Sequence, residues 1–133
     1  MKLANVFYIS SAFFLSLFYL LVSTSPVVAD EDTWRSVTGE WRGSYENSTG
    51  EIGNTVLSLD ENQEGFLRGR WDGIPINGRR INRNTIEFRG QTETRSYLAT
   101  ATVKRGAMEI SYLATRLNSS GSYEGKASLV RDY

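Results

Sequence analysis

The stretch Gly39-Glu40-Trp41-Arg42-Gly43-Ser44-Tyr45 decides how the rest of this 133-residue chain is interpreted. Its opening pattern of a large apolar residue, a polar residue and a glycine recurs in Leu67-Arg68-Gly69-Arg70-Trp71 and again in Tyr123-Glu124-Gly125-Lys126-Ala127. Alternation of apolar and polar residues is typical of a strand with one buried face. The stretch is therefore predicted to be the first strand of a small antiparallel barrel.

Short alternating segments separated by turn residues continue from Gly39 to the end of the chain. The pairs Asp72-Gly73 and Arg105-Gly106 are typical of tight hairpin turns. Pro75 and Gly78 predict that the fourth strand is short, bulged or at a sheet edge. The predicted strands cover 40–46, 53–59, 65–71, 74–80, 85–89 and 94–104, the longest; a seventh alternates through Met108, Ile110, Tyr112 and Ala114, and an eighth covers 123–131.

These strands predict an all-β fold, a single up-and-down antiparallel β-barrel of about eight strands. The connections are all short, and no segment is long enough for a crossover. A β-sandwich is the alternative, because a count of strands does not decide whether the sheet closes. The regular hairpins favour the barrel, since a sandwich usually needs at least one long connection.

The Gly39-Glu40-Trp41 sequence resembles the G-x-W signature of the lipocalin-like (calycin) barrels. In size the chain is nearer to the avidin-like and bacterial metalloprotease-inhibitor members, although the polar biotin contacts of avidins have no match here. The resemblance implies that Trp41 plugs the closed end, covered by an arginine of the last strand. In a closed meander the end of the last strand lies beside the start of the first, which places Arg131 next to Trp41. Gly39, Trp41 and Arg131 are thus the predicted structural residues, and the resemblance favours ligand or protein binding.

The first 29 residues are predicted to be a secretory signal peptide. Lys2 precedes an apolar run over 6–22, and Pro26-Val27-Val28-Ala29 offers a cleavage site. Residues 30–38 are interpreted as an N-terminal arm and 39–133 as the barrel domain. We therefore expect a secreted or periplasmic protein, with an uncleaved N-terminal membrane anchor as the alternative and no stable membrane insertion after cleavage.

The composition argues against several kinds of chemistry. The chain has no histidine and no cysteine, which excludes imidazole or thiolate metal sites and the usual nucleophile–base pairs. No phosphate-binding or dinucleotide-binding motif is present, so we predict no enzyme activity, no cofactor and no metal site. Without Lys2, 15 − 1 = 14 basic residues stand against 15 acidic ones. This near-neutral balance argues against nucleic-acid binding, which depends on excess positive charge.

Four aromatic residues are predicted to line the open end of the barrel as a ligand-binding site: Tyr45, Trp71, Tyr97 and Tyr112. Small residues such as Ala99 and Gly125 alternate with the aromatic ones on the inward face. Two interpretations stay open. Large and small residues can interlock to fill a narrow barrel, or they can leave a cavity into which tyrosine hydroxyls point.

A second candidate surface involves arginine, because seven of the twelve arginines fall between 68 and 95. The predicted partner-binding residues are Trp34 in the arm and Phe66, Arg68 and Arg70 on the outward face. The alternative is a solvated outer face with weak cross-strand ion pairs to Glu87 and Glu93. Together these features predict an exported, non-catalytic binding barrel for a small apolar or aromatic ligand. A protein-binding module, such as an inhibitor of a secreted hydrolase, or a structural envelope protein are the alternatives.

Overall fold

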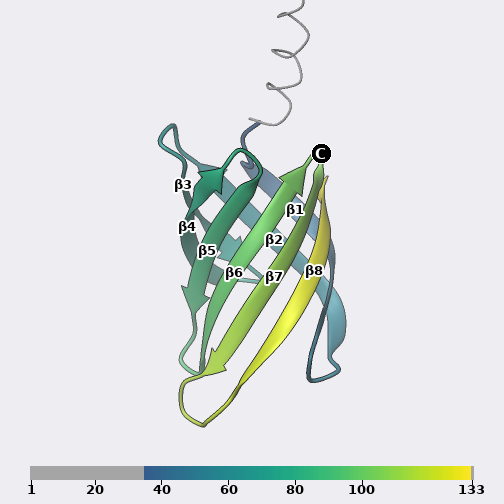
Figure 1. The fold of residues 1–133 in the computed structure, drawn as a ribbon, viewed down its shortest axis with the longest axis vertical. Helices are drawn as coiled ribbons and strands as arrows, with labels where there is room; N and C mark the ends of the chain where they lie inside the picture. The colour runs from purple at the N-terminus through teal and green to yellow at the C-terminus, as the bar shows by residue number, and fades with distance from the viewer. Residues whose placement is uncertain (1–34, 133) are drawn as a thin grey trace, which may run out of the picture. The chain divides into compact units, whose positions relative to one another are not determined.

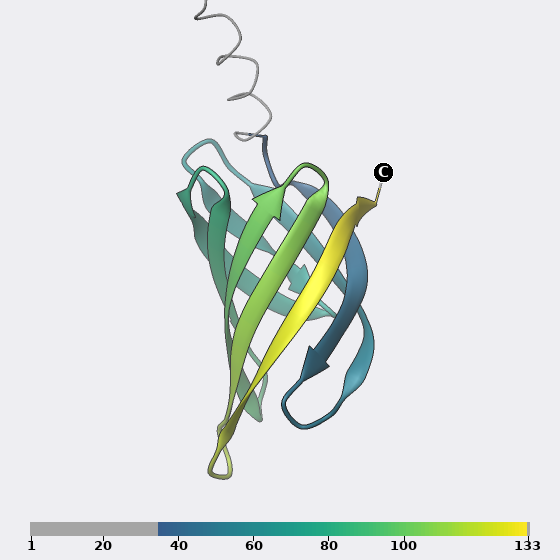
Figure 2. The same ribbon diagram turned by 45° about the vertical axis from the view of Figure 1, so that its right-hand side comes forward.

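The computed structural model describes residues 35–132, which form eight antiparallel strands closed into one barrel (Figure 1). Each strand pairs with the next, and β8 pairs with β1 to close the sheet (Figure 2). The all-β barrel prediction is confirmed, and the sandwich alternative is wrong. The strands are β1 (Gly39–Asn47), β2 (Ile52–Glu61), β3 (Phe66–Trp71), β4 (Ile74–Asn82), β5 (Thr85–Gln91), β6 (Arg95–Lys104), β7 (Ala107–Arg116) and β8 (Ser122–Asp132).

The predicted signal peptide and residues 30–34 of the predicted arm lie outside the described residues. Among residues 35–132, there is no helix with the length and apolar character needed to cross a membrane.

Most apolar residues of the alternating segments face the inside of the barrel, and most polar residues between them face the outside. In β7, Met108, Ile110, Tyr112 and Ala114 are buried, and the residues between them are exposed. Successive side chains of a strand point to opposite faces, so one row fills the interior and the other faces solvent.

The fourth strand differs from its prediction in two respects. It has 9 residues, so it is not short, and it lies between β3 and β5 in a closed sheet that has no edge. The predicted irregularity is present as a register shift between Arg80 and Asn82. The longest strand is β8 with 11 residues rather than β6 with 10, because pairing with β1 extends to Asp132.

The recurring inward glycines allow neighbouring strands to approach closely. A Cβ atom at Gly43 would lie 1.8 Å from the carbonyl oxygen of Ser128, and one at Gly69 would lie 1.8 Å from that of Ser58. Backbone atoms cannot move aside as a flexible side chain can, so the tight coiling of the sheet requires glycine at both positions. The repeated glycine pattern in the sequence is therefore a consequence of barrel curvature.

Trp41 closes one end of the barrel. Its side chain is fully buried, and its indole N–H donates a 3.0 Å hydrogen bond to the Val37 carbonyl. The Arg131 guanidinium carbon lies 4.4 Å from the centroid of the indole ring, as the closed topology led us to expect. Arg131 also donates hydrogen bonds to the carbonyls of Thr38 (2.6 Å) and Ser36 (2.8 Å). A Cβ at Gly39 would lie 3.0 Å from Nη1 of Arg131, so glycine leaves room for this contact.

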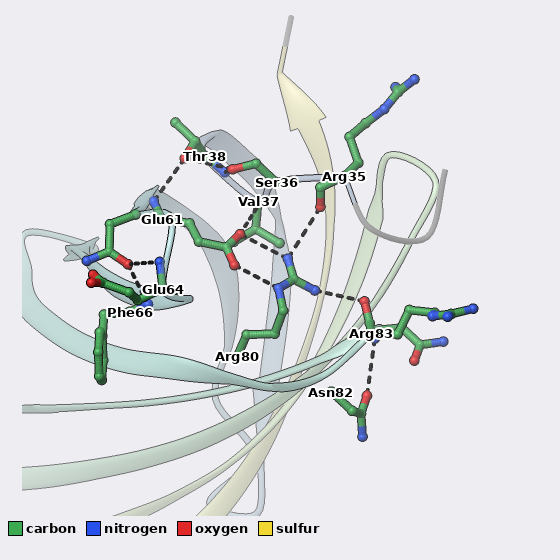
Figure 3. Close-up of polar contacts among 12 residues, drawn as sticks. Arg35, Ser36, Val37, Thr38, Glu61, Glu64, Phe66, Arg80, Asn82 and Arg83 are labelled. Carbon is green, nitrogen blue, oxygen red and sulfur yellow. Dashed lines mark hydrogen bonds and ion pairs between the residues drawn. The ribbon is translucent and has the colours of Figure 1, made fainter. Parts of the chain in front are cut away.

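A buried ion pair lies beside this plug and was not anticipated from the sequence. Arg80 donates through Nε to Glu61 at 2.7 Å, and the two side chains are only 10% and 8% exposed. Figure 3 shows the Arg80 guanidinium between the Glu61 carboxylate and the backbone carbonyls of Arg35 and Arg83. The Glu61 carboxylate accepts a further bond from the Val37 N–H at 3.0 Å. Burial of Glu61 opposes ionisation, yet its hydrogen bonds with Arg80 and Val37 hold the pKa of the carboxyl below its ordinary value.

Residues 35–38 of the predicted arm are thus packed onto the closed end. Val37 is fully buried and joins the hydrophobic core, although the sequence analysis assigned it to an arm that could contact a partner. The interior above the plug is filled by apolar side chains, including Leu57, Ile86, Phe88, Ile110 and Leu129. The site therefore has to lie at the opposite end of the barrel.

Candidate ligand-binding site

The opposite end of the barrel is open and contains a pocket of about 200 Å³. The turns over 48–51, 72–73, 92–94 and 117–121 surround this end (Figure 1). All four residues predicted to bind a ligand contribute to its wall. The lining residues are Tyr45, Asn47, Glu51, Thr55, Trp71, Asp72, Ile74, Arg95, Tyr97, Tyr112 and Tyr123. The interpretation of a filled interior thus holds at the closed end, where apolar side chains pack together. The interpretation of a cavity holds at the open end, where the pocket lies.

Trp71 forms the apolar floor of the pocket and is held by aromatic contacts. Its ring meets those of Phe88, Tyr97 and Tyr112 edge to face, with centroid separations of 5.5, 6.1 and 5.1 Å. Edge-to-face geometry is favourable because the positive ring edge meets the negative ring face. The orientation of Trp71 is therefore fixed by the protein itself.

A chain of hydrogen bonds fixes the polar edge of Trp71. The indole N–H donates to Thr55 Oγ1 at 2.8 Å, and the Thr55 hydroxyl donates to Asp72 Oδ2 at 2.6 Å. The other Asp72 oxygen accepts the Val56 N–H at 2.8 Å. Asp72 has a φ of 51°, the left-handed conformation of the hairpin turn that Asp72-Gly73 predicted. The turn thus aims a carboxylate into the barrel and orients the floor of the pocket.

Two tyrosine rings of the wall lie over glycines on neighbouring strands. Tyr45 is paired with Gly53, where a Cβ would lie 2.8 Å from the Tyr45 ring. Tyr112 is paired with Gly125, where a Cβ would lie 2.2 Å from Cζ of Tyr112. Each ring is therefore pressed against backbone, which limits its motion before any ligand arrives.

The rim next to Tyr45 is polar. The Tyr45 hydroxyl donates to Glu51 Oε2 at 2.8 Å, and Asn47 Nδ2 donates to Glu51 Oε1 at 3.2 Å. The hydrogen bond from Tyr45 lowers the pKa of Glu51, and the same bond raises the pKa of Tyr45. The carboxylate is thus occupied by donors of the protein.

Two arginines that were not predicted to be part of this site lie at the open end: Arg95, which lines the pocket, and Arg116, which lies beside the pocket residue Tyr123. Arg95 and Arg116 are directly opposite each other in the β6–β7 register. Their guanidinium carbons lie 5.8 and 5.2 Å from the centroid of the Tyr123 ring. Arg95 is exposed, as the alternative of a solvated arginine surface predicted, but it lies on the inward row of Tyr97 and not on the outward face. The shared odd-numbered row was the signal that could have identified it.

Tyr123 should ionise later than an ordinary tyrosine. Burial, followed by the neighbouring Tyr97 hydroxyl, raises the pKa of Tyr123 from 10.0 to about 12. Because the folded pKa is raised, the stability from neutral Tyr123 is fully present below pH 10 and is lost as the pH rises toward about 12. An absorbance titration of phenolate should show a late step that disappears in Tyr123→Phe. If Tyr123→Phe instead lost a titration step near pH 10 and kept the late step, the burial of Tyr123 would be contradicted.

The predicted partner-binding residues lie elsewhere. Phe66 is 58% exposed, and Arg68 and Arg70 are also exposed on the outward row of β3. Arg70 donates to the Gly73 carbonyl at 3.1 Å. The expected ion pair to Glu87 does not form within residues 35–132, although Arg79 lies opposite Glu87 in the register. The structure thus places Phe66, Arg68 and Arg70 together on one face. Trp34 lies outside the described residues, and its role in partner binding stays a prediction.

Residues 35–132 contain no cluster of acidic side chains able to hold a metal ion. The polar groups that line the pocket are hydroxyls, the Asn47 amide, the Arg95 guanidinium and the carboxylates of Glu51 and Asp72, both of which already accept hydrogen bonds. This arrangement can surround and orient an aromatic molecule.

Comparison with known proteins agrees with the fold. No protein-family profile and no curated protein matches the chain. Among solved structures, the chain is similar to EF1p2_mFAP2b bound to DFHBI, with a TM-score of 0.56 and 10% identity over 72% of this chain and 94% of that one. It is also similar to a redesigned β-barrel, mFAP1, bound to DFHBI, with a TM-score of 0.50 and 14% identity over 71% and 94% of the two chains. A rhizavidin–biotin complex follows with a TM-score of 0.49 and 16% identity over 68% and 91%.

The chain shares with these structures the fold of a small closed antiparallel β-barrel. The low identities mean that these likenesses show the fold alone, so the site must be interpreted from its own residues.

Proposed function

We propose that this chain is a binding barrel that takes a small aromatic ligand into its open end. The observation that carries the proposal is the pocket of about 200 Å³ whose floor is Trp71 and whose walls include Tyr45, Tyr97 and Tyr112. Sites for drug-sized ligands usually have about 300–1,000 Å³, so this pocket suits a ligand of roughly two fused rings. Aromatic walls held in place before binding reduce the entropy that is lost when a ligand is bound.

Two further observations support the proposal. Similar barrels have been solved with the small molecule DFHBI bound. The predicted signal over residues 1–29 supports action outside the cytoplasm, which intact-mass measurement of the protein purified from its own source would test. The same native preparation, analysed by mass spectrometry, would reveal a retained small molecule.

A neutral bicyclic probe, 2-naphthamide, tests the pocket directly by isothermal titration calorimetry. Removal of one stacking ring in Tyr97→Ala should weaken binding about two- to twelvefold, because an aromatic pair contributes about 0.5–1.5 kcal/mol. Phe66→Ala is the matched control, since it removes an aromatic ring from the outward face and should leave binding unchanged. Equal weakening in the control would refute the proposal, and so would failure of the wild-type protein to bind either 2-naphthamide or its carboxylate analogue, 2-naphthoate.

One observation favours a protein partner as a second candidate. Phe66 is a large apolar side chain that is 58% exposed, and it lies on the same outward row as Arg68 and Arg70. Aromatic and arginine side chains are enriched where proteins bind each other. If this surface binds a partner from the source organism, Phe66→Ala should release it and Leu113→Ala, on the outward row of β7, should not. Retention of the partner by both variants would remove this surface from consideration.

A further inference from the structure

Two positively charged side chains lie close together at the open end of the barrel. Arg95 begins β6 and Arg116 ends β7, and the two residues are direct cross-strand partners. Both belong to inward rows, with Tyr97 and Ala99 on β6 and with Tyr112 and Ala114 on β7. Like charges directly opposite each other in a sheet are destabilising. Both guanidiniums also lie over one ring, that of Tyr123.

No carboxylate among residues 35–132 offsets this repulsion by direct contact. Within residues 35–132, neither Arg95 nor Arg116 forms an ion pair at 4.0 Å or less. The two acidic residues of the pocket have other partners. Glu51 accepts from Tyr45 and Asn47, and Asp72 accepts from Thr55 and the Val56 N–H. Arg95 also forms a hydrogen bond with the Tyr97 side chain, but within the described residues neither guanidinium is in direct contact with a carboxylate.

We propose that the ligand of this pocket is an aromatic carboxylate, whose ring packs on Trp71 and whose carboxylate is bound by Arg95 and Arg116. The proposal rests on the proposed function, because it specifies the chemical class of the ligand for the same pocket. Arginine has planar, forked donors that match the two oxygens of a carboxylate. A bound anion also offsets the repulsion between the two guanidiniums. Relief of this repulsion adds to the binding free energy that the new contacts provide.

The dimensions and chemistry of the pocket agree with this class. Its inner part offers the aromatic surfaces of Trp71, Tyr97 and Tyr112, and its outer part includes Arg95. An anionic group on a ring system that enters ring first therefore reaches the mouth. A cationic group on the same ring would meet Arg95 and Arg116 instead, which selects against aromatic amines.

The test compares two probes that share one ring system and differ in charge. Isothermal titration calorimetry at low ionic strength would measure the affinities of 2-naphthoate and 2-naphthamide for the wild-type protein, Arg95→Gln, Arg116→Gln and the double variant. A charge-assisted bidentate contact should make the wild type prefer 2-naphthoate by about tenfold or more. Each single variant should reduce this preference, and the double variant should abolish it while its affinity for 2-naphthamide stays within about twofold.

Arg89→Gln is the matched control, because it removes an exposed arginine from the outward row of β5 and should keep the preference. If the wild type binds both probes equally, or if the double variant keeps the preference, the aromatic-carboxylate proposal is wrong and the binding pocket itself stands. If neither probe binds to the wild type, the proposed function fails together with it. Circular dichroism of every variant checks that the barrel is folded.

Discussion

Replacing Trp41 with alanine is expected to lower the free energy of unfolding by about 3–5 kcal/mol, the cost typical of deleting a buried aromatic side chain. Trp41 is fully buried, donates to the Val37 carbonyl at 3.0 Å and lies under Arg131. The alanine variant would leave a cavity at the closed end and remove the surface on which Arg131 packs. Urea unfolding followed by far-ultraviolet circular dichroism measures the loss.

Trp41→Phe is the control for this prediction. It keeps an aromatic ring in the core and removes the indole N–H, so its loss of stability should be clearly smaller than that of alanine. A loss below about 1 kcal/mol for Trp41→Ala, the size of an average substitution, would show that Trp41 is not the plug of the barrel.

Replacing Glu61 with methionine should also cost about 3–5 kcal/mol of unfolding free energy, because it leaves the buried charge of Arg80 without its partner. The exposed Arg42–Asp132 pair is a matched comparison. Both pairs have an N–O distance of 2.7 Å, but the side chains of Arg42 and Asp132 are 55% and 45% exposed. Solvent screens an exposed pair, so Asp132→Asn should change stability far less than Glu61→Met.

A double variant distinguishes the cost of leaving the Arg80 charge unpaired from the cost of lost packing. Glu61→Met with Arg80→Met removes both charges, and it should be more stable than Glu61→Met alone. A double variant that is equally stable or less stable would mean that Glu61 acts mainly through its hydrogen bond with Val37.

Low pH should remove the contribution of Glu61 to the free energy of unfolding. The folded pKa of this carboxyl is lowered from its ordinary value of 4.5, so its contribution is present above pH 4.5 and is lost as the pH falls through the lowered pKa. The difference in unfolding free energy between the wild type and Glu61→Met should therefore shrink in acid. A difference that stays constant across this range would contradict a buried, ionised Glu61.

The barrel and the aromatic part of its site could be predicted because they follow from alternation. Strand boundaries fall within a few residues of the alternating segments, and Tyr45, Trp71, Tyr97 and Tyr112 share the inward rows. The contact between Trp41 and Arg131 followed from the resemblance to G-x-W barrels together with closure of the sheet. These features depend on the two-residue period with which side chains of a strand alternate between faces, and this period is visible in the order of apolar and polar residues.

The charged part of the interior could not be predicted in the same way. Arg80, Arg95 and Arg116 lie on inward rows, but residue type alone assigns arginine to the surface. Their positions depend on cross-strand register and on which carboxylate or ring each side chain can reach. The burial of Val37 likewise depends on the path of the chain before β1, for which alternation gives no signal.

The chain enters the barrel and β8 ends at the closed end, where Trp41, Arg131 and the Glu61–Arg80 pair hold the fold together. The open end consists of hairpin turns alone, over 48–51, 72–73, 92–94 and 117–121. None of these four turns contains a residue of the closed-end network, but Asp72 in the turn over 72–73 orients Trp71 through Thr55. Changes of length or sequence in the other three turns can therefore alter what the pocket accepts at little cost to folding. This architecture is suited to divergence of ligand specificity, whether by natural variation or by loop exchange in the laboratory.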